Sequence, residues 1–211
     1  MKLYHYLFIS LFFLALTTVN AQQEYFEYGF KGGVNLSNIT GGDTTYDSRT
    51  SMNIGGYGLY KILPKLGVQA ELLYSEQGFS DDYPSVNPEV DEVKEILRMQ
   101  YFNLPVLGSY NLIENLWIEA GAQLGYLVHA ESERDEISLD DLGSVNSNTT
   151  TIPETDNYER FDLSAVGGFR YKLNRNFMLQ ARYTKSLSDI NKNLAGDQFN
   201  EIWSFSVGFV F

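Results

Sequence analysis

Cysteine, histidine and long apolar runs are scarce in this chain of 211 residues. Because there is no cysteine, neither disulfides nor thiolate metal sites can hold the protein together. The two histidines, His5 and His129, are too few for an acid–base constellation. After the N-terminal segment, no stretch approaches the roughly 20 apolar residues that a membrane-spanning helix needs. These absences point to a fold stabilised by backbone hydrogen bonding and burial.

Positive charge is also scarce. The chain has 15 lysines and arginines against 27 aspartates and glutamates, which gives a formal net charge of −12. Binding to nucleic acid depends on neutralising phosphates with cationic side chains. We therefore expect no nucleic-acid partner.

The N-terminus has the three parts of a secretory leader. Lys2 precedes an apolar run over residues 7–16, and Val19-Asn20-Ala21 supplies small residues at a cleavage site. The sequence therefore predicts a Sec signal peptide over residues 1–21 and one mature domain over residues 22–211.

The C-terminus alternates large apolar side chains with small ones. Ser204, Ser206 and Gly208 separate the members of this row, which are Trp203, Phe205, Val207, Phe209 and Phe211. Successive side chains of a strand point to opposite faces, and lipid accepts an unbroken apolar row. We expect this segment to close an outer-membrane barrel and to be read by the barrel-assembly machinery.

The same period of two recurs along the chain. Seven further strands are expected, at about residues 25–36, 52–62, 66–75, 98–110, 116–128, 158–173 and 177–186. The connections after the second, fourth and sixth strands are short, and the others are long, as in outer-membrane barrels. The sequence therefore predicts an all-β fold, an eight-stranded antiparallel up-and-down transmembrane β-barrel with short periplasmic turns and long extracellular loops.

Two local features carry further expectations. Pro105 lies inside a predicted strand, and since proline cannot donate to a ladder, we expect a bulge or a locally broken pair there. The longest predicted loop, residues 129–157, is too acidic to be buried and is expected outside the cell. Its carboxylates lack the spacing of a dedicated calcium loop. They are Glu131, Glu133, Asp135, Glu136, Asp140, Asp141, Glu154 and Asp156.

Charged residues recur on the strand face opposite the apolar one. They are Glu27, Lys31, Lys61, Glu71, Glu119, Asp162, Arg170, Lys172 and Arg182. A soluble eight-stranded barrel of the lipocalin type would turn apolar side chains inward, the opposite of this pattern. We expect these charges to pair and fill the narrow lumen, with a proton or ion path as the alternative. No catalytic residue, cofactor or metal site is expected.

Four ordered motifs resemble the PorT-like outer-membrane β-barrel family. They are Gly29-Phe30-Lys31-Gly32-Gly33-Val34-Asn35-Leu36-Ser37, Gly55-Gly56-Tyr57, Gln69-Ala70-Glu71-Leu72-Leu73-Tyr74-Ser75-Glu76-Gln77-Gly78 and Tyr101-Phe102-Asn103-Leu104-Pro105-Val106. The resemblance implies an eight-stranded barrel in the outer membrane of bacteroidete-type bacteria. A few members of this family take part in protein secretion or in gliding-type machinery, and the resemblance extends to this chain the expectation of such a role.

Two classes of function follow. The first is a non-enzymatic barrel that anchors acidic extracellular loops for a structural role or for binding a ligand or partner. The second is a component of a secretion or transport assembly, or a narrow channel. The expected surroundings are outer-membrane lipid and other envelope proteins.

Overall fold

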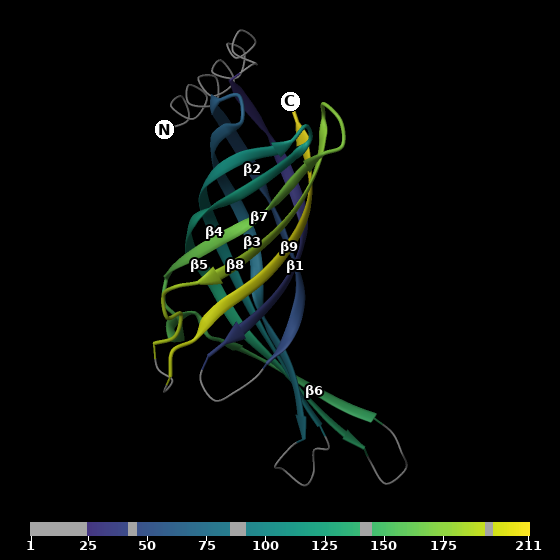
Figure 1. Ribbon diagram of the computed structural model, residues 1–211. Helices are drawn as coiled ribbons and strands as arrows, with labels where there is room; N and C mark the ends of the chain where they lie inside the picture. Colours follow the sequence, from purple (N-terminus) through teal and green to yellow (C-terminus); the bar gives the residue numbers. More distant parts are fainter. Residues whose placement is uncertain (1–24, 42–45, 85–91, 140–144, 193–195) are drawn as a thin grey trace, which may run out of the picture.

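The computed structural model describes residues 25–41, 46–84, 92–139, 145–192 and 196–211. The predicted signal peptide, residues 1–21, lies outside them. The described residues form nine strands and one short 3-10 helix (Figure 1). These are β1 (Phe26–Thr40), β2 (Asp47–Leu63), β3 (Leu66–Pro84), β4 (Glu92–Ile113), β5 (Leu116–Leu139), β6 (Val145–Pro153), η2 (Thr155–Asn157), β7 (Phe161–Lys172), β8 (Phe177–Ser186) and β9 (Phe199–Val210).

Eight of the strands form a closed antiparallel ring. Each strand pairs with its neighbour in the chain, except that β5 pairs directly with β7. The ring is closed by β1 and β9, in register from Gly29↔Val210 to Thr40↔Phe199. The eight-stranded barrel is therefore confirmed, and β6 is an additional strand that pairs with β5 outside the ring.

The outward face of the ring is apolar, as the period of two predicts. Trp203, Phe205, Val207, Phe209 and Phe211 are all exposed on the outside of β9 and at its end. Closure of the ring pairs the backbone groups of β9 on both sides, so the strand can contact hydrocarbon without leaving them unsatisfied.

Aromatic side chains mark both ends of the apolar band. Towards the extracellular end, ring pairs include Tyr183 with Trp203 at 4.9 Å and Tyr126 with Phe161 at 5.3 Å between centroids. Towards the periplasmic end, Phe211 stacks on Tyr28 at 5.4 Å. Aromatic girdles at both interfaces are typical of outer-membrane barrels. Among the described residues, no helix has the length and apolarity to cross a membrane.

Several strands run beyond their predicted ends. β3 continues to Pro84, β4 begins at Glu92, and β5 continues to Leu139, all within segments expected to be polar connections. The predicted loop over residues 129–157 is therefore wrong in large part, because it contains the end of β5 and all of β6. Polar residues dominate these extensions even where one face is buried, as at Phe79, Val93 and Leu97, so the apolar alternation that located the barrel could not locate them.

Pro105 interrupts pairing without shifting the register. The β3–β4 ladder passes from Ala70↔Val106 to Leu73↔Asn103 with no pair between them and the same offset on both sides. The locally broken pair is therefore present, and the bulge is not. A register shift occurs instead between β4 and β5, from Gln100↔His129 to Tyr101↔Leu127.

Close approach of two strands explains one glycine of the second predicted strand. A Cβ atom added at Gly55 would lie 2.0 Å from the carbonyl oxygen of Leu72, so any larger residue would push β2 and β3 apart. Its neighbour Gly56 has no such contact, with its nearest atom at 3.6 Å.

The extracellular half of the barrel interior contains an apolar core. A cluster of buried side chains forms it, several of them from segments predicted to be polar connections or loops. Its members are Ile39, Phe79, Leu97, Met99, Tyr101, Leu127, Ala130, Tyr158 and Ile190. A bridge between Tyr158 and Asn191 joins the segment before β7 to the segment after β8 above this core. The interior is thus closed at its extracellular end by apolar packing.

Leu72→Arg tests the assignment of the lipid face. Leu72 is 61% exposed on the outside of β3, so we expect the variant to lose about 2 to 4 kcal/mol of unfolding free energy in phospholipid vesicles. The matched control is Ile152→Arg, because Ile152 is also exposed but lies on β6 outside the ring. Denaturant titration measures the unfolding free energy of both variants. Equal losses in the two would contradict the assignment of Leu72 to the lipid-facing side of β3.

Candidate functional site: the charged interior

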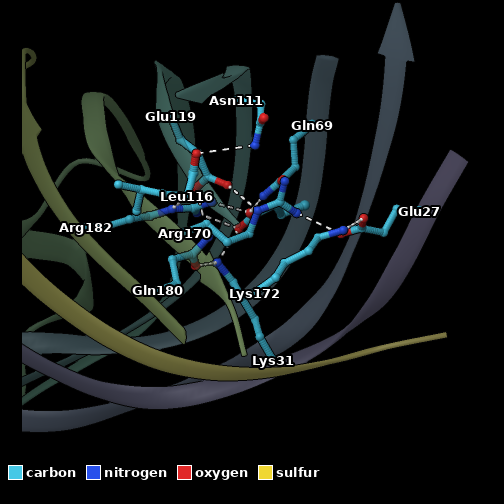
Figure 2. Close-up of polar contacts among 11 residues, drawn as sticks. Glu27, Lys31, Gln69, Asn111, Leu116, Glu119, Arg170, Lys172, Gln180 and Arg182 are labelled. Carbon is cyan, nitrogen blue, oxygen red and sulfur yellow. Dashed lines mark hydrogen bonds and ion pairs between the residues drawn. The ribbon is translucent and has the colours of Figure 1, made fainter. Parts of the chain in front are cut away.

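The charged side chains meet in the half of the barrel nearer the periplasm. Alternation turns one residue in two toward the lumen, and the antiparallel ring brings these positions to a similar depth from β1, β3, β5, β7 and β8. Figure 2 shows the side chains reaching toward one another from several strands. We call this set the lumen network, and its members are Glu27, Lys31, Glu71, Glu119, Arg170, Lys172 and Arg182.

Arg182 joins two carboxylates from different strands. Its guanidinium contacts Glu71 through both oxygens, Nη1 to Oε2 at 2.8 Å and Nη2 to Oε1 at 2.6 Å. Nη2 also lies 2.7 Å from Oε2 of Glu119. All three side chains are almost completely removed from solvent. Such two-point contacts are strong and directional, so they fix the relative positions of β3, β5 and β8.

Lys31 extends the lumen network to β1. Its Nζ lies 2.6 Å from Oε2 of Glu71 and donates a hydrogen bond to Oε1 of Gln180 at 2.7 Å. The amide nitrogen of Gln180 donates in turn to Oε2 of Glu119 at 2.9 Å. The sequence reasoning collected charged residues and so omitted Gln180, although its inward position on β8 was the signal for it.

The periplasmic part of the lumen network is organised around Glu27. Its Oε1 accepts from Nη1 of Arg170 at 2.9 Å, and its Oε2 accepts from Nζ of Lys172. Arg170 is fully buried, and its Nε lies 3.3 Å from Oε1 of Glu119, which links the two parts. The ring of Trp117 lies 5.2 Å from Cζ of Arg170 and covers the guanidinium, a cation–π contact.

Two of the nine predicted lumen charges lie outside the network. Lys61 is half-buried at the periplasmic mouth and makes no ion pair with a described residue. Asp162 lies eight residues from Arg170 along β7, in the extracellular half. It accepts hydrogen bonds from Ser186 at 2.7 Å and Asn200 at 3.2 Å. Neutral donors satisfy this carboxylate, so it needs no cation.

One small cavity lies beside the lumen network. Beside Arg182, a polar cavity of about 20 Å³ is lined by residues that include Asn35, Asn53 and Gln123. A space of this size is comparable to that of one water molecule. The lumen network and the extracellular apolar core therefore close the barrel in series.

His129 does not form a catalytic arrangement. Its Nε2 lies 3.4 Å from Oε2 of Glu131, and its Nδ1 lies 3.5 Å from Oγ1 of Thr155. That hydroxyl already accepts from the amide of Ala130 at 2.9 Å and donates to its carbonyl at 3.1 Å. Its proton is therefore directed to the carbonyl of Ala130 and not to His129. In the part of the chain that the structure describes, no three histidine or acidic side chains are grouped to hold a metal ion.

Arg182→Met tests whether the lumen network stabilises the barrel. The variant leaves Glu71 and Glu119 buried without their shared cation, and we expect it to cost about 3 to 5 kcal/mol of unfolding free energy. The control is Arg98→Met, which removes an ion pair of 2.6 Å to Glu133 that is partly exposed, and should cost about 0 to 1 kcal/mol.

Neutralising one carboxylate checks the cause of that loss. Adding Glu119→Gln to Arg182→Met restores the wild-type excess of one cation and leaves Lys31 paired with Glu71 and Arg170 paired with Glu27, so part of the lost stability should return. Equal unfolding free energies for Arg182→Met and Arg98→Met would contradict a stabilising role for the network.

Comparison with known proteins found similar solved structures and one matching family model. Among solved structures, Ail, the attachment invasion locus protein of Yersinia pestis, is 14% identical with a TM-score of 0.49, covering 88% of this chain and 98% of Ail. Neisserial surface protein A is 13% identical with a TM-score of 0.42, covering 86% and 96%. CarO of Acinetobacter baumannii is 12% identical with a TM-score of 0.42, covering 85% and 97%.

The search of curated protein sequences returned no match. The family model for the outer membrane protein beta-barrel domain matches residues 20–192, which is most of the chain. The protein therefore belongs to the outer membrane protein beta-barrel domain family.

Proposed function

We propose that this protein is a non-enzymatic outer-membrane anchor that presents a β-sheet outside the cell to bind an extended segment of another protein. The observation that carries the proposal is the free edge of β6. The closed interior supports it as well, because a barrel filled by paired charges and apolar packing is suited to anchoring rather than to conduction.

The presented sheet is an extension of the barrel wall. Beyond the ring, β4 pairs with β3 on one side and with β5 on the other, and β5 pairs along residues 131–139 with β6. Figure 1 shows the hairpin of β5 and β6 extending away from the barrel body. From Tyr126 in the girdle to Leu139, β5 extends roughly 40 Å at about 3.3 Å per residue. The sheet can therefore contact a partner beyond the membrane surface.

β6 lacks the usual protection of an edge strand. Among the described residues it is the last strand of the sheet, and none of its nine residues is charged. Its only proline, Pro153, is at its end, and the side chains of residues 147–153 are exposed. Natural proteins commonly block free edges with lysine, proline or bulges, because an open edge pairs with other strands. An open edge is the structure that strand addition requires.

The surroundings of the edge indicate the charge of the partner. β5 carries Glu131, Glu133, Asp135 and Glu136 beside β6. Of these, Glu133 is paired with Arg98, while the described structure has no Lys or Arg ion pair for the other three. An extended segment flanked by basic residues would therefore complement the edge, and its binding should weaken as salt increases.

Single proline substitutions on β6 test strand addition. Successive residues of an edge strand direct their N–H groups alternately toward the neighbouring strand and away from it. Thr149→Pro and Thr150→Pro should therefore differ, one removing a bond to β5 and the other only an outward donor. Amide hydrogen exchange identifies which variant keeps the β5–β6 hairpin.

The probe is a set of short, β-prone peptides with lysines at their ends, added to the mature protein in nanodiscs. We expect wild-type binding that falls at high salt, and its loss in the proline variant that keeps the hairpin. Undiminished binding by that variant, or no binding of any peptide by the wild type, would contradict strand addition.

A role in a secretion or transport assembly is the second candidate. It is favoured by the four ordered motifs that resemble PorT-like barrels. Crosslinking in intact cells followed by purification of the full chain distinguishes the candidates, since an assembly component would bring a reproducible set of envelope proteins. A narrow channel is disfavoured by the paired interior.

We further propose that residues 1–21 direct Sec export and that the C-terminal row of β9 is read by the barrel-assembly machinery. Phe211→Ala should then reduce the folded protein in outer membranes by several-fold, while refolding into vesicles from urea remains nearly as efficient as in wild type. Comparing heat-modifiable electrophoretic bands from both preparations measures this. Equal losses in cells and in vesicles would assign Phe211 to packing alone.

A further inference from the structure

A cleft of about 440 Å³ lies at the periplasmic mouth of the barrel. Its wall contains Lys61 from β2, Lys172 from β7 and Arg175 from the turn between β7 and β8. The wall also contains the carboxylate of Glu27 and the aromatic rings of Phe26 and Phe211. The proposed function does not use this cleft.

The cleft has more positive than negative charge. Glu27 already forms ion pairs with both Arg170 and Lys172. Neither Lys61 nor Arg175 makes an ion pair with a described residue. The terminal carboxylate of Phe211 also forms no ion pair within 4 Å in the described structure.

The barrel interior next to the cleft also has more cations than carboxylates. The lumen network holds four cations against three carboxylates. Within it, the buried Nη2 of Arg170 has no hydrogen-bond partner. Buried and partly buried cations are stabilised by counter-charges. Even with the terminal carboxylate of Phe211 counted beside Glu27, the cations of the cleft outnumber its carboxylates, so this end of the barrel would be stabilised by a further anion.

The position of the cleft indicates where that anion comes from. Phe211 stacks on Tyr28 at 5.4 Å and meets Phe209 edge-on at 5.3 Å, so this wall belongs to the periplasmic aromatic girdle. Such girdles lie at the depth of lipid headgroups. The cleft therefore has cations directed to the lumen mouth and aromatic rings directed to the membrane interface.

We propose that this cleft binds a phosphate group, supplied by the headgroup of an anionic phospholipid of the periplasmic leaflet. Lys61 and Lys172 act as point charges, and the guanidinium of Arg175 offers a two-point contact to phosphate oxygens. The acyl chains of the same lipid lie against the aromatic girdle outside. Bound in this way, the lipid provides the missing negative charge and fixes the periplasmic end of the barrel in the membrane.

The test compares lipid retention by the mature protein in vesicles that contain phosphatidylcholine alone or with phosphatidylglycerol. Native mass spectrometry counts lipids retained after detergent extraction. The variant Lys61→Gln/Arg175→Gln removes two cleft cations that have no ion pair to lose, so the barrel should still fold, which heat-modifiable electrophoresis checks. The control Lys65→Gln/Lys192→Gln makes the same change in net charge at exposed positions that do not line the cleft.

We expect phosphatidylglycerol to be retained by the wild type and by the control, with roughly 30-fold weaker retention by the cleft variant, since each interfacial basic residue contributes about a factor of five. A third arm adds inorganic phosphate to the protein in phosphatidylcholine alone. Phosphate binding that needs the cleft cations, without preferential retention of phosphatidylglycerol, would keep the phosphate site but assign it to a soluble ligand. Equal retention by wild type, cleft variant and control, with no phosphate binding, would overturn the proposal.

Discussion

The contact of Arg182 with Glu71 and Glu119 satisfies the main constraint on this barrel. A ring of eight strands has an interior only wide enough for side chains, so charges turned inward must find their partners within it. Arg182 joins β8 to β3 and β5, and Lys31 and Arg170 bring β1 and β7 into the same network. The closed ring and the paired interior therefore depend on each other, because strand register sets which charges meet.

Different parts of the barrel along its axis contain different kinds of side chain. The lumen network occupies the part nearer the periplasm, an apolar core lies in the extracellular half, and aromatic girdles position the outer surface in the membrane. The sheet formed by β3, β4, β5 and β6 beyond the ring is free of these packing demands. A rigid, closed base with an open edge strand outside the membrane is an arrangement suited to binding another protein.

Alternation of residues predicted the ring, its lipid face and its short turns, because lipid and a narrow lumen impose opposite demands on successive residues. It failed where those demands end: β6 is wet on both faces, and Phe79 and Leu97 pack into a core that the polar residues around them concealed. The charges that face inward were recognisable, but their partners depend on the register across five strands. Asp162 is satisfied by Ser186 and Asn200, which no spacing in the sequence indicates.

The lumen network and the apolar core close the interior in series. Single-channel recording in planar bilayers, using protein shown to be folded by heat-modifiable electrophoresis, tests this closure. We expect no reproducible conductance steps across a range of voltages. Regular steps of one size from the folded wild-type protein would contradict it, because they require a continuous water-filled path past Arg182.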